Sequence, residues 1–386
     1  MTRALVALVL LTATAAAQPA HLDPSEALAM QSPEAPEVIV LTFGVGERIF
    51  EKFGHAAICL AWRGSGREPV CFNYGVTNFS AGEELVWGFL RGRQKFWLDP
   101  ERWGAIVAFY EWEDRDIFEQ TLPVTPEQAH AFERTLLGDL DEAHRYYVYD
   151  HFFDNCTTRL RDMIDRITGG KLRAGGDAQY ALTFRAMGRR GLAEEPELVA
   201  LTDFVAGRQL DDTPTMWQAM FYPAVLREQL RDKLGAEPVQ IYHRKGRSFP
   251  TAASLGARFG MLALAAVFAL PLVIAVWRRR YERLATAWAA LYLGLWGVVL
   301  WGLAIVSSIP GLRWNEAVLV LVPFDLALPF LGVALRRRYA QVRVIELLAV
   351  SILCAVGVLH QPLWIPILTA IVPLATVYAS LVRSGR

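Results

Sequence analysis

The chain has 386 residues, of which 53% are hydrophobic and 20% are charged. An average soluble domain carries about 25% charged residues, so the composition excludes a plain soluble globule. The 39 basic residues equal the 39 acidic residues, which argues against a general nucleic-acid-binding protein because such proteins carry a basic excess. The four cysteines include no CxxC pair, which argues against a zinc ribbon or a thioredoxin-type site. We expect no metal and no other cofactor.

The N-terminus has the pattern of a secretory signal peptide. Arg3 is followed by an apolar run at 4–11 and by small residues at 12–17. We expect cleavage near Ala17, because the apolar run is too short to span a bilayer comfortably; an uncleaved anchor is the alternative. Four prolines within residues 18–37 predict a flexible lead-in.

The C-terminal third of the chain, residues 254–386, predicts a bundle of five transmembrane helices. Its apolar runs are 256–277, 285–309, 317–335, 344–359 and 363–382. Arginines follow the first, third and fifth runs, and the positive-inside bias places these ends in the cytoplasm. The C-terminus is then cytoplasmic, and residues 18–254 lie on the other side of the membrane, as the signal peptide also predicts.

The exported part predicts a mixed α+β domain over residues 38–250. Short apolar runs predict strands at 38–43, 56–62, 70–74 and 105–112. Prolines and acidic residues in a first turn mark helix starts, and glycines mark helix ends. These residues predict helices at 125–140, 155–167 and 214–234. The second and third strands form a hairpin with a long glycine-containing loop.

The hairpin places two cysteines opposite each other. If its turn centres on Ser65, Cys59 faces Cys71, and facing strand positions have the separation that a disulfide needs. Two buried free thiols are the alternative reading. In either case Cys156 has no exported partner.

Cys156 is the candidate nucleophile. Asp154 or Asn155 is expected to cap the following helix, so that Cys156 lies in its first turn. There the helix dipole and the free N–H groups lower a thiol pKa and stabilise an oxyanion. A buried structural cysteine at a helix start is the alternative.

His55 is the candidate base for this thiol. It opens the strand at 56–62, and strand alternation places it on the same face as Cys59. On the partner strand Asn73 is one diagonal step from His55, where its amide would orient the imidazole, as in a Cys-His-Asn site. The alternative for Asn73 is a turn residue at a strand end.

These motifs resemble a known family. The order of a histidine on a strand before a cysteine at a helix start resembles the circularly permuted NlpC-type papain-like fold. The strings Phe53-Gly54-His55-Ala56 and Asp154-Asn155-Cys156-Thr157-Thr158-Arg159 resemble the exported domain of Lnb-type bacterial lipoprotein N-acyltransferases. Residues 41–44, 73–75 and 216–221 add to this resemblance, which covers about residues 38–240.

The resemblance implies a membrane-bound acyltransferase of the bacterial inner membrane with a periplasmic catalytic domain. Its acyl donor would be a membrane phospholipid, its intermediate a thioester on Cys156, and its acceptor the α-amine of a diacylglyceryl-modified lipoprotein. Arg159 would bind a lipid phosphate, although an ordinary ion pair in the helix explains it equally well. Two other functions remain open, namely an exported cysteine hydrolase (a phospholipase or a cell-wall peptidase or amidase) and a non-enzymatic membrane receptor or assembly factor.

Overall fold

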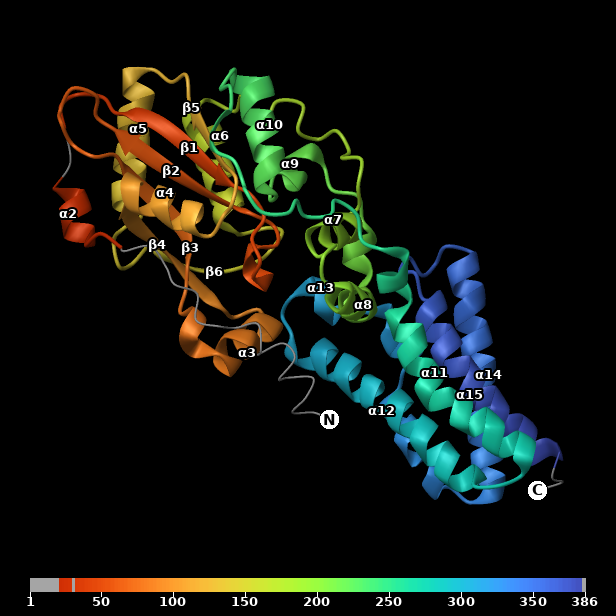
Figure 1. The fold of residues 1–386 in the computed structure, drawn as a ribbon. Helices are drawn as coiled ribbons and strands as arrows, with labels where there is room; N and C mark the ends of the chain where they lie inside the picture. The colour runs from red at the N-terminus through yellow and green to blue at the C-terminus, as the bar shows by residue number, and fades with distance from the viewer. Residues whose placement is uncertain (1–20, 30–31, 384–386) are drawn as a thin grey trace. The chain divides into compact units, whose positions relative to one another are not determined.

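The computed structural model describes residues 21–29 and 32–383 and divides the chain into two compact units (Figure 1). The first unit combines the chain up to Ala181 with residues 213–249, and the second combines residues 182–212 with the chain from Pro250 onward. The expected signal peptide lies outside the described residues. No feature of the sequence indicates that residues 182–212 group with the C-terminal helices.

A seven-stranded antiparallel sheet forms the centre of the first unit, in the order β6-β4-β3-β2-β1-β5-β7. The strands are β1 (Glu37–Phe43), β2 (His55–Ala61), β3 (Val70–Val76), β4 (Lys95–Arg102), β5 (Ile117–Thr121), β6 (Tyr146–Val148) and β7 (Val239–Tyr242). The predicted strands at 38–43, 56–62 and 70–74 are therefore confirmed as β1, β2 and β3. Their long apolar runs are typical of strands buried on both faces.

The β2–β3 register is the one that the sequence predicts, with Cys59 opposite Cys71. The structure joins the two sulfurs, with an S–S distance of 2.11 Å. Both side chains are fully buried. The bridge thus links the strand that begins with His55 to the strand that carries Asn73.

Helices cover both faces of this sheet. Helix α4 (Trp103–Trp112) packs on one face, where its Ile106 and Tyr110 join the core of β1, β2 and β3. Helices α5 (Pro126–Gly138), α6 (Cys156–Ile167) and α10 (Pro223–Leu234) lie on the other face. The phenol of Tyr74 in β3 donates to Asp139 at the end of α5, which ties that helix to the sheet.

Three predictions about the first unit need correction. The strand predicted at 105–112 is wrong, because this segment lies in α4. A short apolar run fits both the helical repeat of 3.6 residues and the strand repeat of two. The buried residues Ile106 and Tyr110 are four apart, as expected on one face of a helix. The single helix predicted at 214–234 is divided into α9 (Met216–Ala219) and α10, which begins at Pro223. Part of the expected flexible lead-in forms helix α2 (Pro24–Leu28), capped by Asp23.

The interval between β3 and α4 is folded rather than a loop. It contains η2 (Phe79–Ala81), helix α3 (Glu83–Arg91) and strand β4. Short helical turns elsewhere are η1 (Ile49–Glu51) in the first unit and η3 (Arg208–Asp211) in the second.

The second unit is helical. It contains α7 (Phe184–Gly191), α8 (Pro196–Val205), α11 (Leu255–Arg278), α12 (Glu282–Val306), α13 (Pro310–Arg313), η4 (Glu316–Leu319), η5 (Pro323–Phe330), α14 (Val333–Ala355) and α15 (Trp364–Arg383). Three segments within it are long and apolar enough to cross a membrane, namely Phe259–Arg278, Glu282–Val306 and Trp364–Arg383.

The five-helix bundle is therefore not reproduced as predicted. The third predicted span, 317–335, is wrong as a helix, because prolines divide it into the short helical turns η4 and η5. The fourth, 344–359, overlaps α14, which begins at Val333 and takes up the arginine cluster at 336–338. The presence of these charges explains why α14 lacks the composition of a simple span.

The broken segment η5 packs closely against α12. A Cβ atom added at Gly297 would lie 2.3 Å from the backbone carbon of Val322, so only glycine permits this approach. The fully buried carboxylate of Asp325 accepts hydrogen bonds from Tyr339 (2.8 Å) and Arg343 (3.2 Å). Arg343 also donates to the carbonyl of Val320 over 2.6 Å, which gives a hydrogen-bond partner to a backbone group between η4 and η5.

Candidate active site

Cys156 is the first residue of α6, and Asn155 is its cap. The Asn155 side chain accepts from the Thr158 N–H, and the Thr158 hydroxyl accepts from the Asn155 N–H, each over 2.8 Å. The Asn155 amide also donates to the carbonyl of Phe221 (3.1 Å), which fixes the turn to α9 and α10. The sequence expectation of Asp154 or Asn155 as the cap is thus resolved in favour of Asn155, and Cys156 lies where the first-turn N–H groups have no partner within the helix.

The structure brings His55, Asn73 and Cys156 together. His55 and Asn73 come from neighbouring strands, and their Nε2 and Oδ1 atoms are 2.6 Å apart. The imidazole also interacts with the Cys156 thiol through a hydrogen bond and through charge. The three residues therefore have the arrangement of a nucleophile, a base and a residue that orients the base.

The electrostatics of the pair favour a thiolate. Burial alone would raise the pKa of Cys156, but the charge of His55 and hydrogen bonds from His55, Thr157 and the Ala56 N–H lower this pKa to about 7. For His55, burial lowers the pKa, while the Cys156 charge and its hydrogen bonds raise it above its ordinary value. Each group thus stabilises the charged form of the other.

Gly75 leaves the space in which the side chains of His55 and Cys156 approach each other. Its φ is +140°, and a Cβ atom there would lie 2.9 Å from His55 Cε1 and 3.6 Å from Cys156 Cβ. A β-bulge between Tyr74 and Val76 places this glycine beside the pair. The absence of a side chain at this position leaves the space in which the imidazole meets the thiol.

A buried carboxylate lies behind Asn73. Asn73 Nδ2 donates to Oε1 of Glu101, which is fully buried in β4, over 2.9 Å. His21, just before α2, lies 3.4 Å from the same oxygen, and its hydrogen bond to Glu101 raises the pKa of His21. The polar chain therefore extends from Cys156 through His55 and Asn73 to Glu101.

A cavity of about 330 Å³ opens beside these residues. Its wall contains Cys156, His55, Asn73 and Gly75, two arginines (Arg48 and Arg115), Glu51 and His151, together with the aromatic residues Phe50, Phe53, Phe79, Phe89, Phe96, Phe109, Tyr110 and Tyr149. Binding sites for apolar ligands combine such a wall with a few polar groups. The cavity is therefore suited to an apolar ligand with a polar group near Cys156 and His55.

A second histidine of this wall is uncharged. Burial lowers the pKa of His151 to about 4. Its ring contacts Phe53, Phe152 and Phe221, and among the described residues its Nε2 has no hydrogen-bond partner. The position of His55 and its interaction with the Cys156 thiol make His55, rather than His151, the candidate base.

Arg159 is placed differently from the residues above. It forms a two-point ion pair with Asp154, with distances of 2.8 and 2.9 Å, and its guanidinium lies 3.9 Å above the Tyr147 ring. It is not among the residues that line the cavity. Its geometry corresponds to the second of the two roles predicted for Arg159, an ordinary ion pair in the helix, and not to a contact with a lipid phosphate in this cavity.

Sequence reasoning missed Glu101 and Arg115. Glu101 lies in a strand that was not predicted, and its partner Asn73 is 28 residues away. Arg115 stands between Asp114 and Asp116, a pattern typical of a solvent-exposed turn, yet it is only 2% exposed. No local signal identifies either residue.

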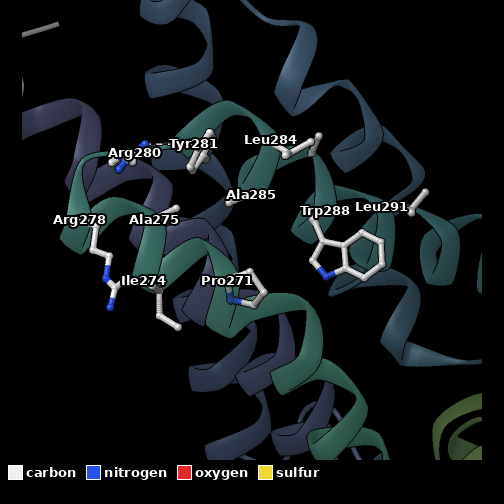
Figure 2. Close-up of a pocket in the computed structure, with 11 residues that line it drawn as sticks. Pro271, Ile274, Ala275, Arg278, Arg280, Tyr281, Leu284, Ala285, Trp288 and Leu291 are labelled. Atoms are coloured by element: carbon white, nitrogen blue, oxygen red, sulfur yellow. Dashed lines mark hydrogen bonds between the residues drawn. The ribbon is translucent and has the colours of Figure 1, made fainter.

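A larger cavity, of about 940 Å³, lies in the second unit between α11 and α12 (Figure 2). Its wall is mainly apolar, with Pro271, Ile274 and Trp288, and it includes Arg278 and Arg280. Among the described residues its wall contains no cysteine, histidine or carboxylate, so it lacks the side chains of a Cys–His site. Within the part of the chain that the structure describes, no cluster of three metal-ligating residues occurs.

Comparison with known proteins agrees with the motifs. Residues 25–189 match the family model described as the Lnb N-terminal periplasmic domain. No curated protein and no solved structure matches the chain. The match confirms the resemblance to the Lnb family for this part of the chain and, with the three apolar helices, supports a membrane protein with an extracytoplasmic domain.

Proposed function

We propose that this protein is a membrane-bound lipoprotein N-acyltransferase. It transfers a fatty acyl chain from a membrane phospholipid, through a thioester on Cys156, to the α-amine of a diacylglyceryl-cysteine lipoprotein. The observation that carries the proposal is the Cys156–His55–Asn73 arrangement at the polar end of an aromatic cavity. The Lnb family match and the apolar helices support it.

The first half-reaction forms the thioester. His55 takes the thiol proton, and the Cys156 thiolate attacks the ester carbonyl carbon of the phospholipid. The N–H groups at the start of α6 stabilise the oxyanion that develops. The carbon–oxygen bond then breaks, the leaving alkoxide takes the proton from His55, and a lysophospholipid departs.

The second half-reaction transfers the acyl group. The uncharged α-amine of the lipoprotein attacks the thioester carbonyl, and His55 accepts the proton that the amine loses. The carbon–sulfur bond breaks, which releases an amide and restores the Cys156 thiolate. Two steps through a reactive thioester replace one slow transfer between an ester and an amine.

The test is mass spectrometry of the full-length protein incubated with phospholipid, with Cys156→Ala and His55→Ala beside the wild type. We expect a fatty-acyl mass on the peptide that contains Cys156, removable by hydroxylamine and absent from both variants. Adding a diacylglyceryl lipopeptide should then discharge the thioester and yield an N-acylated peptide.

Other outcomes point to the other functions. Release of lysophospholipid and free fatty acid without an acylated lipopeptide would identify a hydrolase. The absence of any adduct on folded wild-type protein would contradict the acyl-transfer mechanism and favour a receptor or assembly factor.

A further inference from the structure

Arg115 is a buried cation in the wall of the active-site cavity. It follows α4 and is only 2% exposed. Its Nε donates to the carbonyl of Gly44 over 2.9 Å, and its guanidinium lies 4.6 Å from the Tyr110 ring centre. Its Nη2 is buried and has no hydrogen-bond partner among the described residues.

This arrangement leaves the Arg115 guanidinium without a direct ion pair among the described residues, and Glu113 interacts with its charge only from beyond ion-pair distance. A guanidinium stays protonated in proteins, and burying an ion that lacks a direct partner is energetically costly. One carbonyl and one aromatic face offset only part of that cost. No carboxylate lies within ion-pair distance of Arg115 in the described part of the chain, so an anion from outside would supply the missing interaction.

The other arginines near the site are already paired. Arg48, in the same cavity wall, lies 3.4 Å from Glu51 and 3.2 Å from Glu113. Arg159 is held by both oxygens of Asp154 and does not line the cavity. Arg115 is thus the arginine of this wall that forms no ion pair with a described carboxylate, because Glu113 is paired with Arg48 and interacts with Arg115 only at longer range.

We infer that Arg115 binds the phosphate of the acyl donor, which makes the donor a phosphate-bearing glycerolipid rather than a neutral acylglycerol. This inference rests on the proposed function. Guanidinium groups bind phosphate oxygens through short, charge-assisted hydrogen bonds. The phosphate would lie against Arg115 and the acyl chain against aromatic residues such as Phe89 and Phe96, so that the ester carbonyl comes to Cys156.

The first test compares two donors on the full-length protein in detergent micelles. One is phosphatidylglycerol and the other is diacylglycerol with the same acyl chains, and the readout is the rate of Cys156 acylation. We expect Arg115→Gln to slow acylation by phosphatidylglycerol by about 10- to 100-fold, the loss of one hydrogen bond to a charged group. The slower reaction with diacylglycerol should change much less, because only the effect of the Arg115 charge on His55 is then lost.

The remaining variants interpret the result. Arg115→Lys, which keeps the charge, should recover part of the rate with phosphatidylglycerol. Arg63→Gln removes an exposed charge (74% of the side chain) as a matched control and should leave both rates unchanged. An equal loss with both donors, or a selective loss in Arg159→Gln instead, would overturn the inference.

A second readout needs no turnover. Glycerol 3-phosphate should protect wild-type Cys156 from iodoacetamide, and the protection should be lost in Arg115→Gln. If wild type forms no thioester with either donor but glycerol 3-phosphate protects Cys156 through Arg115, the proposed function fails and the phosphate site stands. A lack of protection in wild-type protein would contradict the phosphate site.

Discussion

The side-chain oxygen of Asn73 lies 2.6 Å from Nε2 of His55, and this contact decides which imidazole nitrogen carries the proton. An amide could present either its oxygen or its nitrogen. Glu101 removes the choice, because its buried oxygen accepts from Asn73 Nδ2 and so directs Oδ1 to the histidine. His55 then donates from Nε2, and its other nitrogen remains free to take the thiol proton.

Replacing Glu101 should therefore change the orientation and the tautomer of His55, although Glu101 acts on His55 only through Asn73. We expect Glu101→Leu to lower the rate of thioester formation by about 100-fold, the contribution of a correctly placed general base. Glu101→Gln keeps an acceptor oxygen and should retain most of the rate. ¹⁵N shifts of neutral His55, measured at pH 8 in a Cys156→Ala background, should show the proton on Nε2 with Glu101 and a changed population with leucine. Unchanged shifts in the leucine variant would contradict this account.

The thiol should titrate near neutral pH. Since interactions with His55 lower the pKa of Cys156 to about 7, the thiolate fraction should rise as pH increases through this value. Iodoacetamide labelling of Cys156 should follow the same curve. In His55→Ala the midpoint should move above the usual value of about 8.5, because burial still opposes the charge. The same midpoint in both proteins would show that the two groups do not interact.

A methyl group at Gly75 should separate the pair. We expect Gly75→Ala to reduce thioester formation by at least about 10-fold and to cost about 1–3 kcal/mol of stability, because its φ disfavours any side chain. Gly64→Ala is the matched control, since Gly64 also has a positive φ (+87°) but no heavy atom within 4 Å of the added Cβ. Equal activity of the two variants would mean that the space beside His55 is not required. The measurement is the acyl adduct on Cys156.

The buried pair in the helical unit should respond to double replacement. Arg343→Leu leaves the buried carboxylate of Asp325 without its cation, which typically costs about 3–5 kcal/mol, whereas Asp325→Leu should cost less because Arg343 keeps its ion pair with Glu346. We expect each single variant to unfold at lower temperature in nanodiscs, and the double variant to recover at least half of the loss. Additive losses would contradict direct coupling between Asp325 and Arg343. Arg63→Gln again serves as the control.

The sequence predicted those parts of the fold that depend on neighbours along the chain. The hairpin register followed from two apolar strands around a glycine-containing turn, and the start of α6 followed from capping chemistry at Asn155. The helix α4 was missed because its short apolar run fits the hydrophobic periodicity of a strand as well as that of a helix. The third span was mistaken because hydropathy counts apolar residues and does not weigh Pro323 and Pro329.

The site divides in the same way. His55, Asn73 and Cys156 belong to short motifs that sequence analysis can recognise. Glu101 and Arg115 are brought to the site only by long-range packing. This packing places the Glu101 carboxylate against Asn73 and the Arg115 guanidinium in the wall of the cavity. Conversely, Arg159 stands one turn from the nucleophile in sequence and is turned to Asp154.

The Cys59–Cys71 bridge also affects whether the candidate nucleophile Cys156 can form a disulfide in an oxidising compartment. Because these two sulfurs are bonded to each other, neither is a free thiol that could be oxidised together with Cys156, and because both are fully buried, thiol–disulfide exchange of Cys156 with the bridge is hindered. Cys156 is then the single free thiol in the described part of the first unit, and Cys354 in α14 is the free thiol of the second. A thiol-reactive dye directed at the first unit would therefore report on one atom, the sulfur on which the proposed acyl transfer depends.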